Sequence, residues 1–234
     1  NCTAGAIHDV TANLEPHDYD GDHYYMWDAK QQYWYGYEWT HHNPAWQPTD
    51  YTYASSFYPR NNTDNRYYND TSTSGRLDAT HSCAIAPNAN EMSWFVAKGD
   101  PHYDQHELWT LMGHLYKGGM WFKKKSILQS EGNYNKEYSA SGVGTDLRST
   151  ILFFANSAVE ELPLISSKDN FFYLPYLGIY VDGRLQDVGS QGFYWSSNSE
   201  PGNSDSAYLL QLSGSGIKVN RFPSSHGYRV QLMD

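Results

Sequence analysis

Short apolar segments separated by polar turns recur along the second half of the chain. Each segment has the length of a β-strand, and Gly, Ser, Asn and Asp lie between the segments. This spacing predicts an antiparallel sheet. The predicted strands fall at 151–154, 171–174, 192–195, 207–210 and 228–231.

Helical patterns are confined to residues 87–115. Asn88 and Asn90 are both suitable N-cap residues for a helix that ends at Gly99. The pair Asp100–Pro101 then predicts the start of a second helix, because proline is favoured at the first helical position. Its apolar stripe consists of Leu108, Leu111, Met112 and Leu115. Helices followed by strands favour the α+β class.

The first 75 residues lack sustained helical periodicity and are rich in Asp, Asn, Tyr and Trp. Segments 24–27 and 33–37 predict short strands between polar turns. From 40 to 75, prolines alternate with many Asn, Asp and Thr residues, which predicts one long irregular loop. Loops of this length inside a domain are uncommon and often functional.

Composition indicates a globular chain with an amphipathic aromatic surface. Hydrophobic residues make up 39% of the 234 residues and charged residues 18%, which is enough apolar material for a core. The formal net charge of −10 disfavours nucleic acid as a partner, because that binding depends on Lys and Arg. No run of about 18 apolar residues is present, so we expect no transmembrane segment.

Cys2 and Cys83 are the only cysteines in the chain. A disulfide between them would close a loop of about 80 residues, which the chain-entropy model values at about 4 to 5 kcal/mol. Two free thiols are the alternative interpretation. Neither cysteine has the spacing of a redox motif or a zinc site, so we expect no cofactor there.

Ordered motifs in the last third of the chain carry a resemblance to a known family. The segments FFYLPYLG, GFYWSSNS, AYLLQL and HGYRVQL follow one another in this order, and DGDHYYMWDA and PNANEMSWFVAKGD precede them. The order resembles the Fibrobacter succinogenes major paralogous domain family, over about residues 18–233. The matching positions are Phe172, Leu174, Pro175, Gly178, Gly192, Tyr194, Trp195, Ser196, Ser197, Ala207, Tyr208, Gly227 and Arg229.

The resemblance implies a C-type-lectin-like domain, related to the formylglycine-generating enzyme fold. We therefore expect one α+β domain over 1–234, with two helices packed on an irregular antiparallel sheet and an insertion at 40–75. Such proteins are secreted or displayed on the outer membrane of Bacteroidetes-like bacteria, and the family has no established catalytic residues. Tyr176 departs from the pattern, since the family prefers Ala there.

Aromatic residues are unusually dense between Trp27 and Trp46. So many rings cannot all point inward from short strands, and exposed rings beside Asp, Asn and His suit a carbohydrate or protein contact. The predicted ligand-binding residues are Trp34, Trp39, His41 and Trp46. The alternative is that these rings pack beneath the long loop. Trp195, on a predicted central strand, is expected in the core.

Two sets of residues have spacings that resemble metal sites. Asp18, Asp20 and Asp22 alternate like the start of a calcium loop, but the glycine and the bidentate glutamate of that loop are misplaced or missing. His102 and His106 are four residues apart, yet the glutamate of a zinc-protease motif is absent. We therefore predict no metal ligands, and calcium stays open only through the three aspartates.

The favoured function is a non-catalytic, secreted or cell-surface module for adhesion to a glycan or a surface partner. The alternative is a structural subunit of a surface appendage. An enzyme related to the formylglycine-generating fold is disfavoured, because its chemistry relies on a late cysteine pair and no cysteine follows position 83. No GxSxG nucleophile motif is present either.

Overall fold

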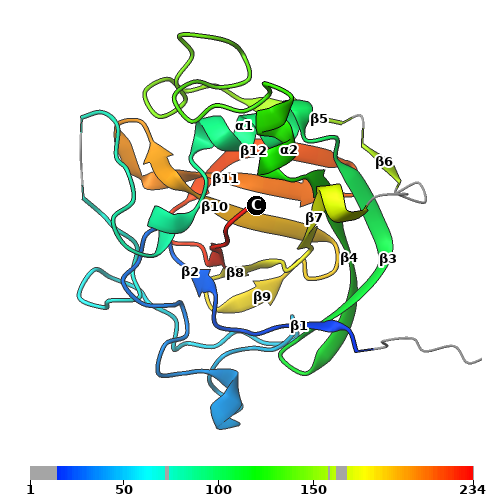
Figure 1. The fold of residues 1–234 in the computed structure, drawn as a ribbon. Helices are drawn as coiled ribbons and strands as arrows, with labels where there is room; N and C mark the ends of the chain where they lie inside the picture. The colour runs from blue at the N-terminus through cyan, green and yellow to red at the C-terminus, as the bar shows by residue number, and fades with distance from the viewer. Residues whose placement is uncertain (1–14, 72–73, 158, 162–167, 234) are drawn as a thin grey trace, which may run out of the picture.

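The computed structural model describes residues 15–71, 74–157, 159–161 and 168–233 of the chain (Figure 1). Most regular structure in these residues is β-strand, arranged in two larger sheets and one small hairpin. Two α-helices accompany them, α1 (Ala89–Lys98) and α2 (Lys125–Ser130). The α+β class is therefore confirmed, with sheets that mix parallel and antiparallel pairs.

The first sheet has the order β1-β3-β4-β7, with β6 also paired to β3. Its strands are β1 (His17–Tyr19), β3 (His102–Leu111), β4 (His114–Lys123), β6 (Glu160–Glu161) and β7 (Phe171–Pro175). β3 and β4 form a long antiparallel hairpin, whereas β1 and β6 pair with β3 in parallel. The strand expected at 171–174 is confirmed as β7.

The second sheet has the order β2-β13-β10-β11-β12-β5. Its strands are β2 (Tyr24–Tyr25), β5 (Phe154–Asn156), β10 (Gln191–Glu200), β11 (Asn203–Ser213), β12 (Gly216–Pro223) and β13 (Tyr228–Arg229). The strands predicted around 192–195 and 207–210 are confirmed, and the one at 228–231 is shorter than expected. A separate hairpin consists of β8 (Ile179–Val181) and β9 (Arg184–Gln186).

Two of the predicted strands differ from the structure. Residues 33–37 form turns, while in 151–154 only Phe154 belongs to a strand. Three short 3-10 helices lie elsewhere in the described residues: η1 (Trp39–His41), η2 (Ser82–Ile85) and η3 (Lys168–Asn170). Aromatic-rich segments such as 33–37 fit a strand by propensity, yet here the chain turns, with the rings of Tyr33 and Trp34 buried and that of Tyr35 53% exposed.

Helix α1 begins where the sequence predicts, because Asn88 and Glu91 form a capping box. The Asn88 side chain accepts the Glu91 N–H at 2.9 Å, and the Glu91 carboxylate accepts the Asn88 N–H at 2.8 Å. The helix ends at Gly99. Met92 and Phe95 are fully buried in the core shared with β10, β11 and β12, and α1 and α2 lie on one side of that sheet (Figure 1).

The second helix predicted after Pro101 is wrong, since the segment forms strand β3. Met112 and Gly113 both have positive φ, 49° and 80°, and make the two-residue turn that joins β3 to β4. Leu108 and Leu115, two members of the presumed stripe, are 50% and 61% exposed. Alternation along β3 buries Trp109 and Leu111 instead, so the spacing of the leucines resembled a helix by coincidence.

Trp195 is buried as predicted. Its exposed fraction is 0%, its ring centroid lies 4.3 Å from that of Tyr228, and its indole N–H donates to the Tyr25 carbonyl at 2.7 Å. The side chain thus ties β10 to both β2 and β13, two strands from opposite ends of the described chain. Removing it would open a cavity at the junction of the sheet and remove the indole hydrogen bond to the Tyr25 carbonyl.

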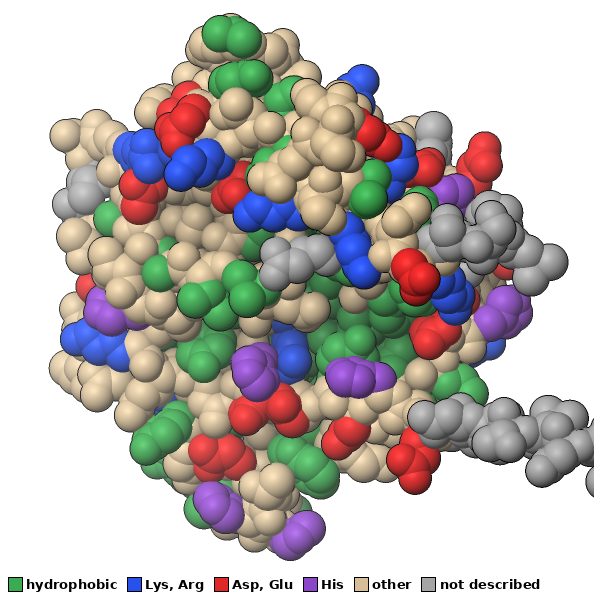
Figure 2. Space-filling view, viewed as in Figure 1, with side chains coloured by type: hydrophobic (Ala, Val, Ile, Leu, Met, Phe, Trp, Pro, Cys, Tyr) green, Lys and Arg blue, Asp and Glu red, His purple; other side chains and the backbone are tan. Residues whose placement is uncertain are grey.

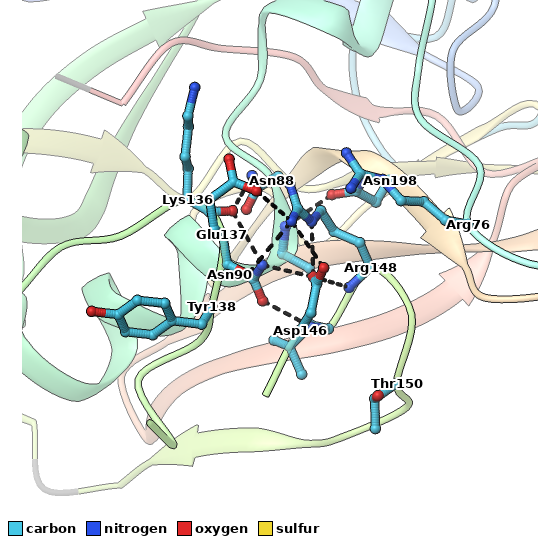
Figure 3. A network of polar contacts seen from close by, with 12 residues as sticks. Arg76, Asn88, Asn90, Lys136, Glu137, Tyr138, Asp146, Arg148, Thr150 and Asn198 are labelled. Atoms are coloured by element: carbon cyan, nitrogen blue, oxygen red, sulfur yellow. Dashed lines mark hydrogen bonds and ion pairs between the residues drawn. The ribbon is translucent and has the colours of Figure 1, made fainter. Parts of the chain in front are cut away.

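A partly buried polar network holds the segment 136–148 against α1 (Figure 3). Asn90 donates to the Asp146 carboxylate at 2.8 Å, and Arg148 makes ion pairs of 2.8 Å with Asp146 and Glu137. Burial acts to raise the pKa of Asp146, but the bonds from Arg148 and Asn90 outweigh it and lower that pKa to about 2. The network therefore works as an ionised unit at neutral pH.

The loop predicted at 40–75 is irregular, as expected. In its described part, regular structure is limited to the end of η1 and one isolated bridge from Ala54 to Arg184. Buried Arg66 organises it: the guanidinium pairs with Asp64 at 2.7 Å, donates to the Phe57 carbonyl at 2.9 Å and lies 4.7 Å from the Tyr37 ring centre. The ion pair of Arg66 and Asp64 is therefore a centre around which the loop packs.

On the face drawn in Figure 2, basic and acidic side chains are interspersed, and hydrophobic side chains line a hollow in its middle. A continuous basic stripe, the footprint of a nucleic-acid surface, is not seen on that face. Within the described ranges, no helix is both long and apolar enough to cross a membrane.

Candidate functional site

A cleft of about 260 Å³ opens between the 40–75 loop and the chain on either side of it. We call it the Asp28 cleft. Its lining residues are Asp28, Lys30, Asn62, Asp64, Asn65, Tyr67, Tyr68, Asn69, Asp70, Thr71 and His81. Amides, carboxylates, hydroxyls and two tyrosine rings dominate this set, whereas aliphatic side chains are absent from the lining.

The Asp28 carboxylate joins the 40–75 loop to residues 80–83. It is fully buried and accepts the backbone N–H groups of Thr80, His81 and Cys83 at 2.8, 2.7 and 3.3 Å. It also accepts the Asn69 amide at 3.0 Å, which fixes the far end of the 40–75 loop. Asp28 has a φ of 51°, a left-handed conformation that Asp tolerates better than most residues. The cleft is therefore preorganised by one anion.

Cys83 belongs to the same arrangement as a structural residue. Its sulfur accepts the Asp28 N–H at 3.1 Å, and its side chain is fully buried. Burial raises the pKa of the Cys83 thiol well above its ordinary value, so it is not a reactive thiolate. The disulfide considered with Cys2 lies outside the described residues.

The rim of the cleft offers exposed groups held in fixed geometry. The Asn62 amide donates to the Asp70 carboxylate at 2.8 Å, and both side chains are exposed. The rings of Tyr67 and Tyr68 lie 4.4 Å apart, and the Tyr68 hydroxyl donates to Asp205 at 2.7 Å. Remaining lone pairs and N–H groups on this rim can meet the hydroxyls of a ligand, while the tyrosine edges offer apolar contact.

Of the three aspartates through which calcium stayed open, Asp20 and Asp22 lie together and Asp18 lies apart. Asp18 accepts the Thr110 hydroxyl at 2.7 Å. Among the described residues, the group that could hold an ion is instead Asp20, Asp22 and His23, all exposed. The Arg229 guanidinium donates to the Asp20 carbonyl at 2.9 Å, and a buried cation this close opposes a metal ion.

The two histidines at metal-ligand spacing lie on β3 and not on a helix. The His102 side chain is 12% exposed and pairs with Asp100 at 3.3 Å, whereas His106 is 83% exposed. A strand sends side chains four residues apart to the same face only while its alternation is regular, and β3 has a bulge between Asp104 and Leu108. The helix-face interpretation of the pair therefore does not apply.

The four ligand-binding residues predicted from the sequence have different surroundings. Trp34 is 1% exposed and packs on Tyr180, with ring centroids 5.3 Å apart, so it offers no surface to a ligand. Trp39 and Trp46 are half-buried, and His41 is 57% exposed. The structure brings His41 and Trp46 together, with ring centroids 5.4 Å apart. None of the four lines the Asp28 cleft.

Comparisons of this chain with protein-family models, curated proteins and solved structures give no match. Inferences about function therefore depend on the residues of the site. The 40–75 loop signals a functional segment by its length, but Asp28 reaches its partners across 41 to 55 residues of sequence. No local pattern reveals contacts of that kind.

Proposed function

We propose that this chain is a non-catalytic, extracellular or cell-surface module that binds a neutral glycan in the Asp28 cleft. The observation that carries the proposal is the cleft itself: amides and carboxylates on a loop fixed by a buried anion, beside paired tyrosine rings. Specific ligand sites place a few convergent polar groups in a concave surface. Its volume of about 260 Å³ suits one sugar unit or the end of a chain.

The proposal includes a C-type-lectin-like fold, as the family resemblance implies. Supporting it, β2 pairs with β13, so strands from the two ends of the described chain lie together. Helix α1 packs against the second sheet, and the long 40–75 loop emerges beside the sheet and carries the cleft. In such an arrangement a stable scaffold presents a variable loop to the ligand.

The second candidate function is a structural subunit that contacts another protein. The observation that favours it is the exposed run Ile151, Leu152 and Phe153, with exposed fractions of 48%, 38% and 62%. Three successive apolar side chains in water suit a protein contact better than a sugar. Self-association measured by analytical ultracentrifugation, and its loss in Phe153→Ser, would support this function.

The experiment for the leading proposal is a glycan-array screen of the intact chain, followed by calorimetric titration of the strongest hit. Asn62→Ala and Asp70→Ala should each weaken affinity by tenfold or more, since both groups are exposed on the rim. Asn203→Ala is the matched control, because Asn203 is an exposed amide that also donates to a carboxylate, Glu200, at 3.2 Å.

Two outcomes contradict the proposal. One is that no glycan on the array binds. The other is that Asn62→Ala and Asn203→Ala bind the hit equally, which would place the site outside the Asp28 cleft. Melting temperatures close to that of the parent chain should accompany both substitutions, because exposed polar side chains contribute little to stability.

A further inference from the structure

A second cleft, of about 320 Å³, is lined by no residue of the Asp28 cleft. We call it the Tyr116 cleft. Its lining residues are Asp50, Tyr51, Tyr116, Leu185, Gln186, Asp187, Val188 and Ser190. They come from the 40–75 loop, from β4, and from β9 with the turn that follows it.

One wall of this cleft is a rigid aromatic ring. Tyr116 stacks on fully buried Trp109, with centroids 5.2 Å apart and an angle of 27° between the planes. The Trp109 indole N–H is itself held by the Gly118 carbonyl at 3.0 Å. Tyr51, 74% exposed, supplies a second ring at the rim. A ring braced from behind loses little entropy when a ligand stacks on it.

Two carboxylates face the same space. Asp187 is exposed and has a φ of 61°, and no hydrogen bond or ion pair involves its carboxylate within the described chain. The turn still holds it in place, because its carbonyl accepts the N–H groups of Ser190 and Gln191 at 3.0 and 2.9 Å. Asp50 accepts two bonds from Thr52, which lower the pKa of Asp50 and keep it ionised.

Positive side chains are absent from the lining of the Tyr116 cleft. Arg184 donates to the Tyr51 carbonyl at 3.4 Å, and His114 lies 3.1 Å from the Thr49 hydroxyl and helps to lower the pKa of Asp50. Neither lines the cleft, so the two carboxylates set its charge. Partly exposed Val188 adds apolar surface at the same place, while Leu185 is buried beneath it.

We infer that the Tyr116 cleft binds an organic ammonium group that carries an apolar body. Aromatic faces attract cations through the ring quadrupole, and the carboxylates of Asp50 and Asp187 supply the counter-charge. Val188 offers apolar contact to the carbon chain, which a bare metal ion lacks. The inference is independent of the glycan proposal, since the two clefts share no residue.

The test is an NMR titration of the intact ¹⁵N-labelled chain with n-butylammonium chloride, and with 1-butanol as the neutral analogue. We expect saturable shifts of the Gly189 and Ser190 amides, with at least tenfold weaker binding of the alcohol. Asp187→Asn should weaken ammonium binding about fivefold to tenfold, because Asn keeps the left-handed conformation and removes the charge.

Asp182→Asn is the matched control, since Asp182 is also exposed, has a φ of 47° and lies outside the cleft. Equal affinity for the alcohol and the ammonium would overturn the inference, as would equal effects of Asp187→Asn and Asp182→Asn. Asn62→Ala, which tests the Asp28 cleft, should leave ammonium binding unchanged, so each proposal fails separately.

Two further probes distinguish the source of the ammonium group. Nα-acetyl-lysine amide represents the side chain of a protein, and glucosamine represents an amino sugar. Binding of either probe at least tenfold tighter than that of its N-acetylated neutral form supports the inference and identifies the source. If both probes bind no better than their neutral forms, the inference is wrong.

Discussion

The Asp28 cleft depends on one buried carboxylate, and Asp28→Ala is the perturbation that tests this. Four N–H donors lose their acceptor: the backbones of Thr80, His81 and Cys83, and the Asn69 amide. Thr80 and His81 are exposed enough for water to replace the carboxylate, but the buried Cys83 donor is left unpaired, at about 1 to 3 kcal/mol.

The left-handed backbone adds to that loss, since alanine at a φ of 51° costs about 1 to 2 kcal/mol. Together with the other three bonds, which water can partly replace, Asp28→Ala should lower the free energy of unfolding by about 3 to 6 kcal/mol. Urea denaturation followed by tryptophan fluorescence measures the change. Hydrogen exchange of the Thr80 and His81 amides reports whether residues 80 and 81 lose their attachment to position 28.

Asp182→Ala separates the two contributions, because Asp182 has a φ of 47° but is exposed and lies outside this network. We expect it to cost only the backbone part. If Asp28→Ala and Asp182→Ala destabilise the chain equally, within about 0.5 kcal/mol, the carboxylate does not organise the cleft and the reasoning fails.

The remaining predictions concern Trp195 in the core, the turn that carries His41 and Trp46, and the polar network between α1 and segment 136–148. Trp195→Ala should lower the free energy of unfolding by about 3 to 5 kcal/mol in urea denaturation, and a neutral effect would contradict its burial. Trp46→Ala should shift stability by only about 1 kcal/mol, since the ring is half-buried; a larger loss would make the turn part of the core. The pKa of Asp146 is lowered to about 2, so its stabilising effect is present above about pH 4 and is lost as the pH falls toward 2. Acid denaturation of Asp146→Asn should therefore show a shallower loss of stability over this range, and an unchanged profile would exclude the ion pair with Arg148 as its source.

Local signals predicted the parts of the fold that local interactions determine. Helix α1 follows from a cap, a glutamate three residues later and a terminal glycine, all within Asn88 to Gly99. The late strands follow from apolar segments between turn residues. Leu108 and Leu115 misled because a seven-residue spacing alone does not separate a helix from a hairpin, and the turn at Met112 and Gly113 decides it.

The site was harder to predict, because its contacts are long-range. Trp34 and Trp46 belong to the same aromatic-rich segment, yet Trp34 is in the core and Trp46 is half-buried, and the burial of Trp34 depends on Tyr180 far along the chain. Asp28 carries no motif, and its role appears only when the 40–75 loop returns to it through Asn69. Composition identified the 40–75 loop as unusual, whereas the residues that line a cleft follow only from the folded structure.

The measurement that tests the central claim most directly is an NMR titration of the intact chain with the strongest glycan-array hit. If the Asp28 cleft is the glycan site, saturable shifts should appear at the Asn69, Thr71 and His81 amides and should need at least tenfold more ligand in Asn62→Ala. Shifts that map to His41 and Trp46, or that saturate at the same ligand concentration in Asn62→Ala, would contradict the account and place the site at the turn that carries His41 and Trp46 or elsewhere.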